Sequence, residues 1–164
     1  MAIVFATGNA NKLAEAQRVL AERFHLVMPS ELGFDGELPE THETLYENAV
    51  EKALFIWNKF QKNCFADDTG LEVDALGGAP GVHSARYAGE PKSPPDNIRK
   101  LLKELEGVPA EKRTARFRCV VALIEEGVLH TFEGICEGHI TTTLHGFDGF
   151  GYDPIFRPLG MNAT

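Results

Sequence analysis

The sequence predicts a mixed α/β fold. Short apolar runs typical of strands alternate with amphipathic helical periods, and two long strand-like segments follow the last helix. The chain has 164 residues, of which 43% are hydrophobic and 24% charged, as in ordinary globular proteins. Domains usually hold about 100–200 residues, so we expect one domain over residues 1–164. A chain of this length buries about 70% of its unfolded surface and needs no metal or disulfide scaffold.

The first elements are a short strand and a helix joined by a polar turn. Ile3 to Phe5 is an apolar run, and Thr7-Gly8-Asn9 are residue types that favour turns and helix caps. The apolar residues that follow share one helical face, and they are Leu13, Ala16, Leu20 and Phe24. The segment from Thr7 to Lys12 is therefore predicted to lie on a strand-to-helix turn.

A second helix is predicted after Thr44, which forms a capping box with Glu47. The apolar stripe expected on this helix consists of Tyr46, Ala49, Ala53, Ile56, Trp57 and Phe60. Two short strands follow, Cys64 to Ala66 and Leu71 to Ala75, with Asp67-Asp68-Thr69-Gly70 between them.

The second half of the chain predicts one helix and a hairpin. The helix opens at Pro94 and closes at Gly107, and its apolar face consists of Ile98, Leu101, Leu102 and Leu105. The segments Arg116 to Ile124 and Val128 to Ile140 form a hairpin around Glu125-Glu126-Gly127. The stretch from Gly146 to Pro154 is too rich in glycine for a regular element.

Charge and composition exclude several partners. Sixteen Lys and Arg against 24 Asp and Glu give a net charge of −8, which argues against nucleic acid polymers and anionic membrane surfaces. The longest apolar run, Cys119 to Ile124, is far shorter than the roughly 20 residues of a membrane span. Cys64, Cys119 and Cys136 are expected to be reduced, buried thiols of a cytoplasmic protein. A small polyanion, bound through a few donors and a divalent cation, remains compatible with this charge.

Two polar segments could carry chemistry. The turn from Thr7 to Lys12 directs backbone N–H groups and a helix N-terminus to one point, which suits a phosphate, although it also fits a simple helix cap. Asp67 and Asp68 are adjacent carboxylates in an apolar neighbourhood, so at least one needs a cation or a proton. Mg²⁺ binds through such carboxylates plus substrate phosphates, with Glu40 as a further oxygen donor. The alternative is an Asx-type turn, and the spacing leaves open which Asp faces the site.

The glycine-rich tail offers a third candidate. Phe147, Phe150 and Tyr152 could stack on a planar base, but taken alone the residues favour a glycine-bent strand with core aromatics. Arg86 is either a phosphate or carboxylate fork or an ion-pair partner.

Four segments together closely resemble the Ham1/inosine triphosphatase family. They are Ala6 to Lys12, Ala66 to Gly81, Ser84 to Gly89 and Gly149 to Phe156. The resemblance implies a long mixed β-sheet with flanking helices, two lobes around a central cleft, and a homodimer. It also implies Mg²⁺-dependent hydrolysis of the purine nucleoside triphosphates ITP, dITP and XTP to the monophosphate and pyrophosphate.

The resemblance also assigns roles to residues. It makes Asp68 a metal ligand and the proton acceptor, and Glu40 a second metal ligand. The residues that it assigns to substrate binding are Thr7, Gly8, Asn9, Ala10, Asn11, Lys12, Thr69, Phe150, Gly151, Tyr152 and Asp153.

The chain departs from the family pattern at two places. His42 stands where the family usually has Gly after Glu-Thr, and the family's later Lys and Ser-His-Arg motifs have no counterpart, so we expect a domain truncated at its C-terminus. The alternative function is therefore a nucleotide-binding protein without turnover.

Overall fold

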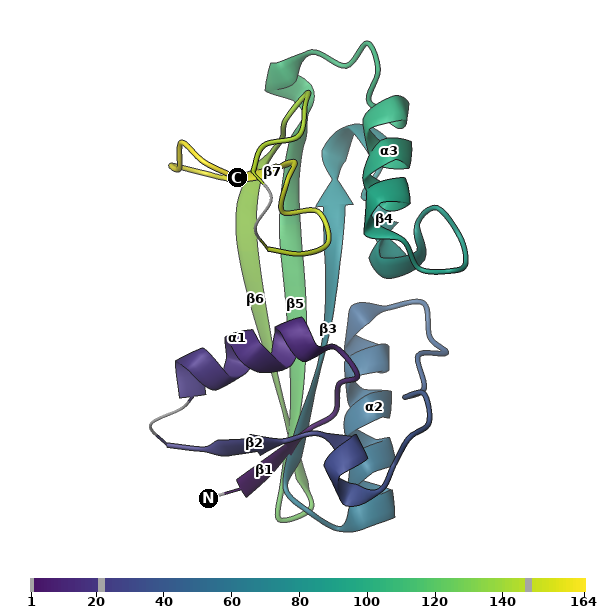
Figure 1. The fold of residues 1–164 in the computed structure, drawn as a ribbon, viewed down its shortest axis with the longest axis vertical. Coiled ribbons are helices and arrows are strands. Elements are labelled where there is room, and N and C mark those ends of the chain that lie inside the picture. Colours follow the sequence, from purple (N-terminus) through teal and green to yellow (C-terminus); the bar gives the residue numbers. More distant parts are fainter. Residues whose placement is uncertain (1, 21–22, 147–148) are drawn as a thin grey trace. The chain divides into compact units, whose positions relative to one another are not determined.

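The computed structural model describes residues 2–20, 23–146 and 149–164, and it consists of two compact units (Figure 1). Unit 1 comprises Met1–Asp68 and Val120–Glu133, and unit 2 comprises Thr69–Cys119 and Gly134–Thr164. The α-helices are α1 (Ala10–Leu20), α2 (Leu45–Phe60) and α3 (Pro94–Glu104). The strands are β1 (Ala2–Phe5), β2 (His25–Val27), β3 (Cys64–Val73), β4 (Pro80–Gly81), β5 (Thr114–Glu125), β6 (Val128–Ile140) and β7 (Phe156–Pro158).

The strands form a mixed sheet, as the sequence predicts. Their order is β2-β1-β3-β5-β6-β7, and β4 pairs with β3. Strand β1 is parallel to both β2 and β3, whereas β4 is antiparallel to β3, and β7 to β6. No helix within the described ranges is long and apolar enough to cross a bilayer.

Helix α2 confirms its predicted start but presents a different buried face. The Thr44 hydroxyl accepts the Glu47 N–H at 3.1 Å, which is the expected N-cap bond. The second bond of the predicted capping box is replaced, because the Glu47 carboxylate accepts the Thr44 hydroxyl at 2.7 Å. The buried residues are Leu45, Asn48, Ala49, Lys52, Ala53 and Ile56, whereas Tyr46 is half exposed. The predicted stripe is therefore wrong at Tyr46. The buried face instead includes Asn48 and Lys52, whose polar partners inside unit 1 allow their burial.

Strand β3 corrects the prediction of two short strands. It runs without interruption from Cys64 to Val73, so Asp67 to Gly70 is strand and not a turn. Asp67 and Asp68 are both buried, although their residue type favours turns. Each has a lysine partner, which removes the need to expose the carboxylates to water.

Unit 2 has its own apolar core. Helix α3 is capped by Ser93 and buries Ile98, Leu101 and the following Leu105 against the sheet residues Leu71 and Val73. The predicted hairpin is confirmed, and its turn residues Glu126 and Gly127, which lie in unit 1, both have positive φ.

Strand β7 is an element that the glycine-rich tail did not predict. It pairs with β6 from Gly138 to Ile140. A side chain at Gly138 would collide with the Arg157 carbonyl and the Phe156 ring, so glycine is required for this close approach.

The three cysteines differ in exposure. Cys64 is fully buried, Cys119 is partly buried and Cys136 is exposed, so the expectation of burial is wrong for Cys136. Strand β6 exposes its side chains from Val128 to Glu137, and Cys136 lies within that stretch. Burial raises the pKa of the Cys64 thiol to about 11.

We predict that a thiol reagent at pH 8 modifies Cys136 in the native protein and leaves Cys64 unmodified. Cys64 should react only after unfolding, because its thiol is both inaccessible and protonated. Mass spectrometry of the labelled peptides before and after denaturant measures this. Native labelling of Cys64 at the rate of Cys136 would contradict the buried position of β3.

Candidate functional site

The turn between β1 and α1 is a self-bonded loop. The Asn9 side chain caps α1, because its Oδ1 accepts the N–H groups of Asn11 at 2.9 Å and Lys12 at 3.3 Å. The Thr7 hydroxyl accepts the Asn9 N–H at 3.1 Å and is buried. The predicted strand-to-helix turn is therefore confirmed, with Thr7 and Asn9 fixing its backbone.

Gly8 lies at the open part of this turn. A Cβ atom at Gly8 would meet nothing within 4 Å, and the residue does not have a positive φ. Neither packing nor backbone conformation therefore requires glycine there. The open space lies at a helix N-terminus, where an anion could approach the backbone.

Lys12 and Asp67 form the first ion pair of the site. The Lys12 Nζ lies 2.5 Å from Asp67 Oδ2, with the two side chains 23% and 11% exposed. The helix α1 thus brings its first-turn lysine onto one side chain of β3, over a sequence separation of 55 residues.

Lys52 joins the other two carboxylates. Its Nζ lies 2.7 Å from Glu40 Oε1 and 3.7 Å from Asp68 Oδ1, and its side chain is only 6% exposed. Asp67 and Asp68 therefore form ion pairs with different lysines, which agrees with the alternation of side chains along a strand. Unit 1 brings together four predicted site residues, Lys12, Glu40, Asp67 and Asp68.

Sequence reasoning missed Lys52. The available signal was its position on α2, seven residues after Leu45 and four before Ile56, on the face that is buried. A lysine on an apolar helical face is buried only with a partner, and the partners, Glu40 and Asp68, could be identified only from the fold.

The environment of Asp68 raises its pKa above the ordinary value of an aspartate. Burial raises the pKa of Asp68, and the neighbouring Glu40 carboxylate adds to the increase. The Lys52 and Lys12 charges and a hydrogen bond from Asn48 act in the opposite direction, but the pKa remains above its ordinary value.

The carboxylates fit a divalent cation held jointly with a ligand. Among the described residues, no group of three or more His, Cys, Asp or Glu side chains is arranged to hold a metal by itself. Glu40 and Asp68 share the Lys52 ammonium, so two hard oxygen donors lie on one cation already. Mg²⁺ is commonly bound by one or two carboxylates plus phosphates, which matches this donor set.

The loop that carries Glu40 accommodates His42 without strain. Among the described residues other than glycine, positive φ occurs only at Gln61 and Glu126. The His42 N–H donates to Asn48 Oδ1 at 2.9 Å, and Asn48 Nδ2 donates to the His42 carbonyl at 3.2 Å. Glycine is therefore not required at this position.

The remaining predicted residues belong to unit 2. Thr69 lies in β3, and Phe150 to Asp153 form turns before β7. Asp153 Oδ2 accepts the Phe150 N–H at 2.8 Å, and Tyr152 is buried with its hydroxyl donating to the Ser84 carbonyl at 2.8 Å. Burial raises the pKa of Tyr152, which keeps this donor protonated. Phe147 lies outside the described residues.

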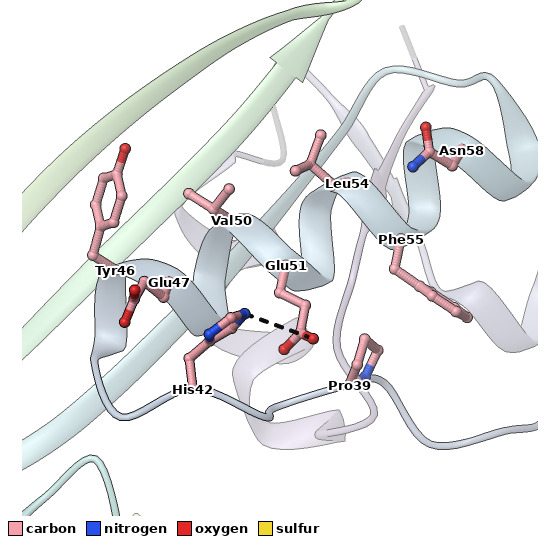
Figure 2. Close-up of a pocket in the computed structure, with 9 residues that line it drawn as sticks. All are labelled: Pro39, His42, Tyr46, Glu47, Val50, Glu51, Leu54, Phe55 and Asn58. Carbon is pink, nitrogen blue, oxygen red and sulfur yellow. Dashed lines mark ion pairs between the residues drawn. The ribbon is translucent and has the colours of Figure 1, made fainter.

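A depression of about 510 Å³ lies on the outer face of α2, and it contains none of the predicted site residues (Figure 2). Tyr46, Val50 and Leu54 line it on the helix, and His42 and Glu51 face each other at its side. Because Lys52 is on the buried face of α2, this depression is separate from the carboxylate cluster.

A capped strand-to-helix turn beside paired carboxylates and lysines is typical of α/β proteins that bind phosphorylated ligands. Comparison with known sequences specifies the class: residues 3–164 match the model of the Ham1 family. The chain is 48% identical to a dITP/XTP pyrophosphatase of Flavobacterium johnsoniae over all of this chain and 84% of that protein. It is 50% identical to one of Porphyromonas gingivalis, over 99% of this chain and 83% of that protein. The chain belongs to the Ham1 family.

Solved structures agree with this membership. The Ham1 protein of Staphylococcus aureus matches with a TM-score of 0.86 and 39% identity, over all of this chain and 84% of that one. A nucleoside-triphosphatase or dITP/XTP pyrophosphatase of Mycobacterium abscessus matches with a TM-score of 0.82 and 40% identity, over 100% and 87% of the two chains. The α/β fold class predicted from the sequence is confirmed.

Gly8→Ala should separate stability from ligand binding. Because alanine fits the backbone and the space at Gly8, thermal stability should stay equal or rise by about 0.4–1 kcal/mol. Loss of a phosphate contact to the backbone should weaken binding of a purine nucleoside triphosphate by about tenfold or more, since a hydrogen bond to a charged group contributes ~1.5–3 kcal/mol.

Calorimetry of the triphosphate complex and a thermal melt measure the two effects. Gly134→Ala is the matched control, because a Cβ at Gly134 also meets nothing within 4 Å. Unchanged affinity in Gly8→Ala would mean that the ligand does not approach this turn.

Proposed function

We propose that the chain hydrolyses non-standard purine nucleoside triphosphates, namely ITP, dITP and XTP, to the monophosphate and pyrophosphate. The activity fits the relatives whose names state dITP/XTP pyrophosphatase and which match nearly the whole chain. The observation that carries the proposal is the cluster of Lys12, Lys52, Glu40, Asp67 and Asp68 in unit 1. The lysines of this cluster can bind phosphate oxygens, and its carboxylates can bind a metal ion and accept a proton.

The chain's own residues divide the task. Lys12 and the α1 N-terminus hold the triphosphate, because an ammonium and the positive end of a helix dipole are complementary to phosphate oxygens. Lys52 holds Glu40 and Asp68 in place and keeps their mutual repulsion low. A water molecule attacks the α-phosphorus, and Asp68 accepts the water's proton at a carboxylate oxygen. The bond from the α-phosphorus to the oxygen that bridges to the β-phosphorus breaks, and pyrophosphate leaves with that oxygen.

The raised pKa of Asp68 suits this role. A general base works best when its pKa lies near the working pH, and burial shifts that of Asp68 in this direction. The Lys52 and Lys12 charges oppose the increase in the pKa of Asp68, because both favour the ionised carboxylate.

Mg²⁺ is the metal that we propose for this site, with Glu40 and Asp68 as its protein ligands. When bound, Mg²⁺ neutralises negative charge on the phosphoryl oxygens. This explains how a chain of net charge −8 can bind a substrate that itself carries several negative charges. The two carboxylates are hard oxygen donors, as this cation requires.

The base-binding residues belong to the same proposal. Thr69 contacts the substrate, and Phe150, Gly151, Tyr152 and Asp153 line the purine pocket. The Asp153 bond to the Phe150 N–H fixes the turn backbone, so the segment has a defined shape. Buried Tyr152 supports that segment from the core of unit 2.

Asp68→Asn tests the proposed chemistry. The substitution keeps the side-chain shape but removes the proton acceptor and a metal ligand, so kcat should fall by at least 10²–10⁴-fold. Pyrophosphate release from ITP with Mg²⁺ measures the change, and circular dichroism checks the fold. Asp67→Asn, which alters the neighbouring carboxylate paired with Lys12, is the matched comparison.

A near-normal rate in Asp68→Asn, or a far larger loss in Asp67→Asn, would remove Asp68 from this role. Absence of pyrophosphate release from the unmodified chain, with intact ITP binding, would instead support the alternative of a nucleotide-binding protein without turnover.

We also propose that the chain acts as a cytoplasmic homodimer. Strand β6 supports the dimer, because it exposes Val128, Leu129, Phe132 and Ile135. The register of β7 on β6 runs from Gly138 to Ile140, and the Leu159 N–H donates to the Glu137 carbonyl at 2.8 Å. The side chains from Val128 to Glu137 are exposed. Exposed apolar side chains gathered on one strand suit a contact with a copy of the same strand about a two-fold axis. We propose that this contact is centred on Phe132, which is the most exposed of the four side chains.

Phe132→Glu should convert the dimer to a monomer, because a charge at the two-fold axis meets its own copy. Sedimentation velocity at several protein concentrations measures the mass. Val19→Glu, at an apolar residue of α1 that is also highly exposed, should leave the dimer intact. A Phe132→Glu dimer as stable as the unmodified one would place the interface elsewhere.

A further inference from the structure

Three consecutive residues of the loop before α2 are each held by a different side chain of that helix. Lys52 bonds the Glu40 carboxylate, and Asn48 bonds both the N–H and the carbonyl of His42. The middle residue, Thr41, is held by Glu51, whose two oxygens accept separate bonds. The Thr41 N–H donates to Oε2 at 2.9 Å, and the Thr41 hydroxyl donates to Oε1 at 2.8 Å.

Glu51 therefore holds Thr41, the residue that follows Glu40, which is the proposed metal ligand. Its two bonds fix both the backbone and the side chain of Thr41, which a single bond would not do. The His42 Nε2 lies 3.9 Å from Glu51 Oε1, and Figure 2 shows the two side chains pointing toward each other. His42 thus adds a contact on the same carboxylate.

The alternative explanation for Glu51 is a solvated acidic face of α2. A residue that only increases solubility would make few bonds, whereas Glu51 binds Thr41 twice and has a side chain only 23% exposed. Glu47, one turn earlier on the same helix, serves as a contrast, because it bonds Thr44 at the helix cap and does not contact Thr41 in the bonds that the structure records.

We propose that Glu51 is a positioning residue for the metal site: by bonding Thr41 to α2, it keeps the Glu40 carboxylate on Lys52, the ammonium that also pairs with Asp68. The inference rests on the proposed function, because Glu40 is a metal ligand only under that proposal. Its consequence is specific. Glu51 sets how tightly the divalent cation is held and leaves the chemical step at saturating metal unchanged, because it touches neither the substrate nor the reacting atoms.

The test compares Glu51→Ala with Glu47→Gln. In Glu51→Ala the Mg²⁺ concentration for half-maximal pyrophosphate release from ITP should rise about 10-fold or more, the usual cost of removing an outer partner of a metal ligand. The kcat at saturating Mg²⁺ should stay within about twofold of the unmodified chain. Glu47→Gln should leave both quantities unchanged, because its carboxylate holds a different residue.

A readout without turnover accompanies the kinetics. Hydrogen exchange resolved at the Thr41 amide should be faster in Glu51→Ala and unchanged in Glu47→Gln, because only the first loses the acceptor of that N–H. Binding of Mn²⁺, followed by electron paramagnetic resonance with a non-hydrolysable triphosphate present, should weaken by the same factor as the Mg²⁺ activation.

Thr41→Val gives an independent check, since it removes the hydroxyl bond and keeps the N–H bond. It should raise the metal requirement by less than Glu51→Ala, and the double variant should be no worse than Glu51→Ala alone. If the effects of the two substitutions on the metal requirement were fully additive, the proposed role of Glu51 in holding Thr41 would be wrong.

Glu40→Gln separates the two levels of the argument. If it leaves Mg²⁺ activation and Mn²⁺ binding unchanged, Glu40 is not a ligand, and the metal assignment under the proposed function is wrong. If Glu40→Gln weakens the metal but Glu51→Ala changes neither the metal requirement nor the Thr41 exchange, the metal site stands and the inference about Glu51 is wrong.

Discussion

Two adjacent carboxylates buried in one strand are the constraint on which unit 1 depends. Asp67 and Asp68 are neighbours on β3, where successive side chains point to opposite faces, and the structure pairs each with a different lysine. The fold supplies Lys12 from α1 on one side and Lys52 from α2 on the other. Removing one lysine from such a buried pair leaves an unpaired charge, typically at a cost of about 3–5 kcal/mol. The positions of α1 and α2 on the strand are thus tied to the two aspartates.

This arrangement is poorly explained by stability alone. Replacing buried ion pairs by well-packed apolar side chains is often neutral or stabilising, so a cluster of three carboxylates and two lysines is weak evidence for a structural purpose. The raised pKa of Asp68 points the same way, since it records a carboxylate held in an environment that opposes its charge. Perturbed titration beside an open helix N-terminus is the pattern expected of a functional site.

The sequence predicted the elements well where local chemistry determines them. The Thr44 cap, the turn at Glu126 and Gly127, and the turn from Thr7 to Lys12 depend on neighbouring residues, and all three are confirmed. Strand β3 was predicted in two pieces, because Asp67 to Gly70 has turn composition. The burial of these aspartates is offset by distant partners: Lys52, 16 residues from Asp68, and Lys12, 55 residues from Asp67. Local propensity contains no information about such partners.

The same reasoning explains which part of the site was missed. Lys12, Glu40 and Asp68 stand in or beside recognisable motifs, whereas Lys52 and Glu51 occupy ordinary positions within a helix. Consecutive residues on a helix point about 100° apart, so Lys52 faces inward to two carboxylates while Glu51 faces the loop. Together they fix the side chain of Glu40 and the backbone beside it. Neighbouring residues of one helix can therefore hold both a ligand side chain and the backbone next to it. Neither contact can be predicted until the fold brings the loop and the helix together.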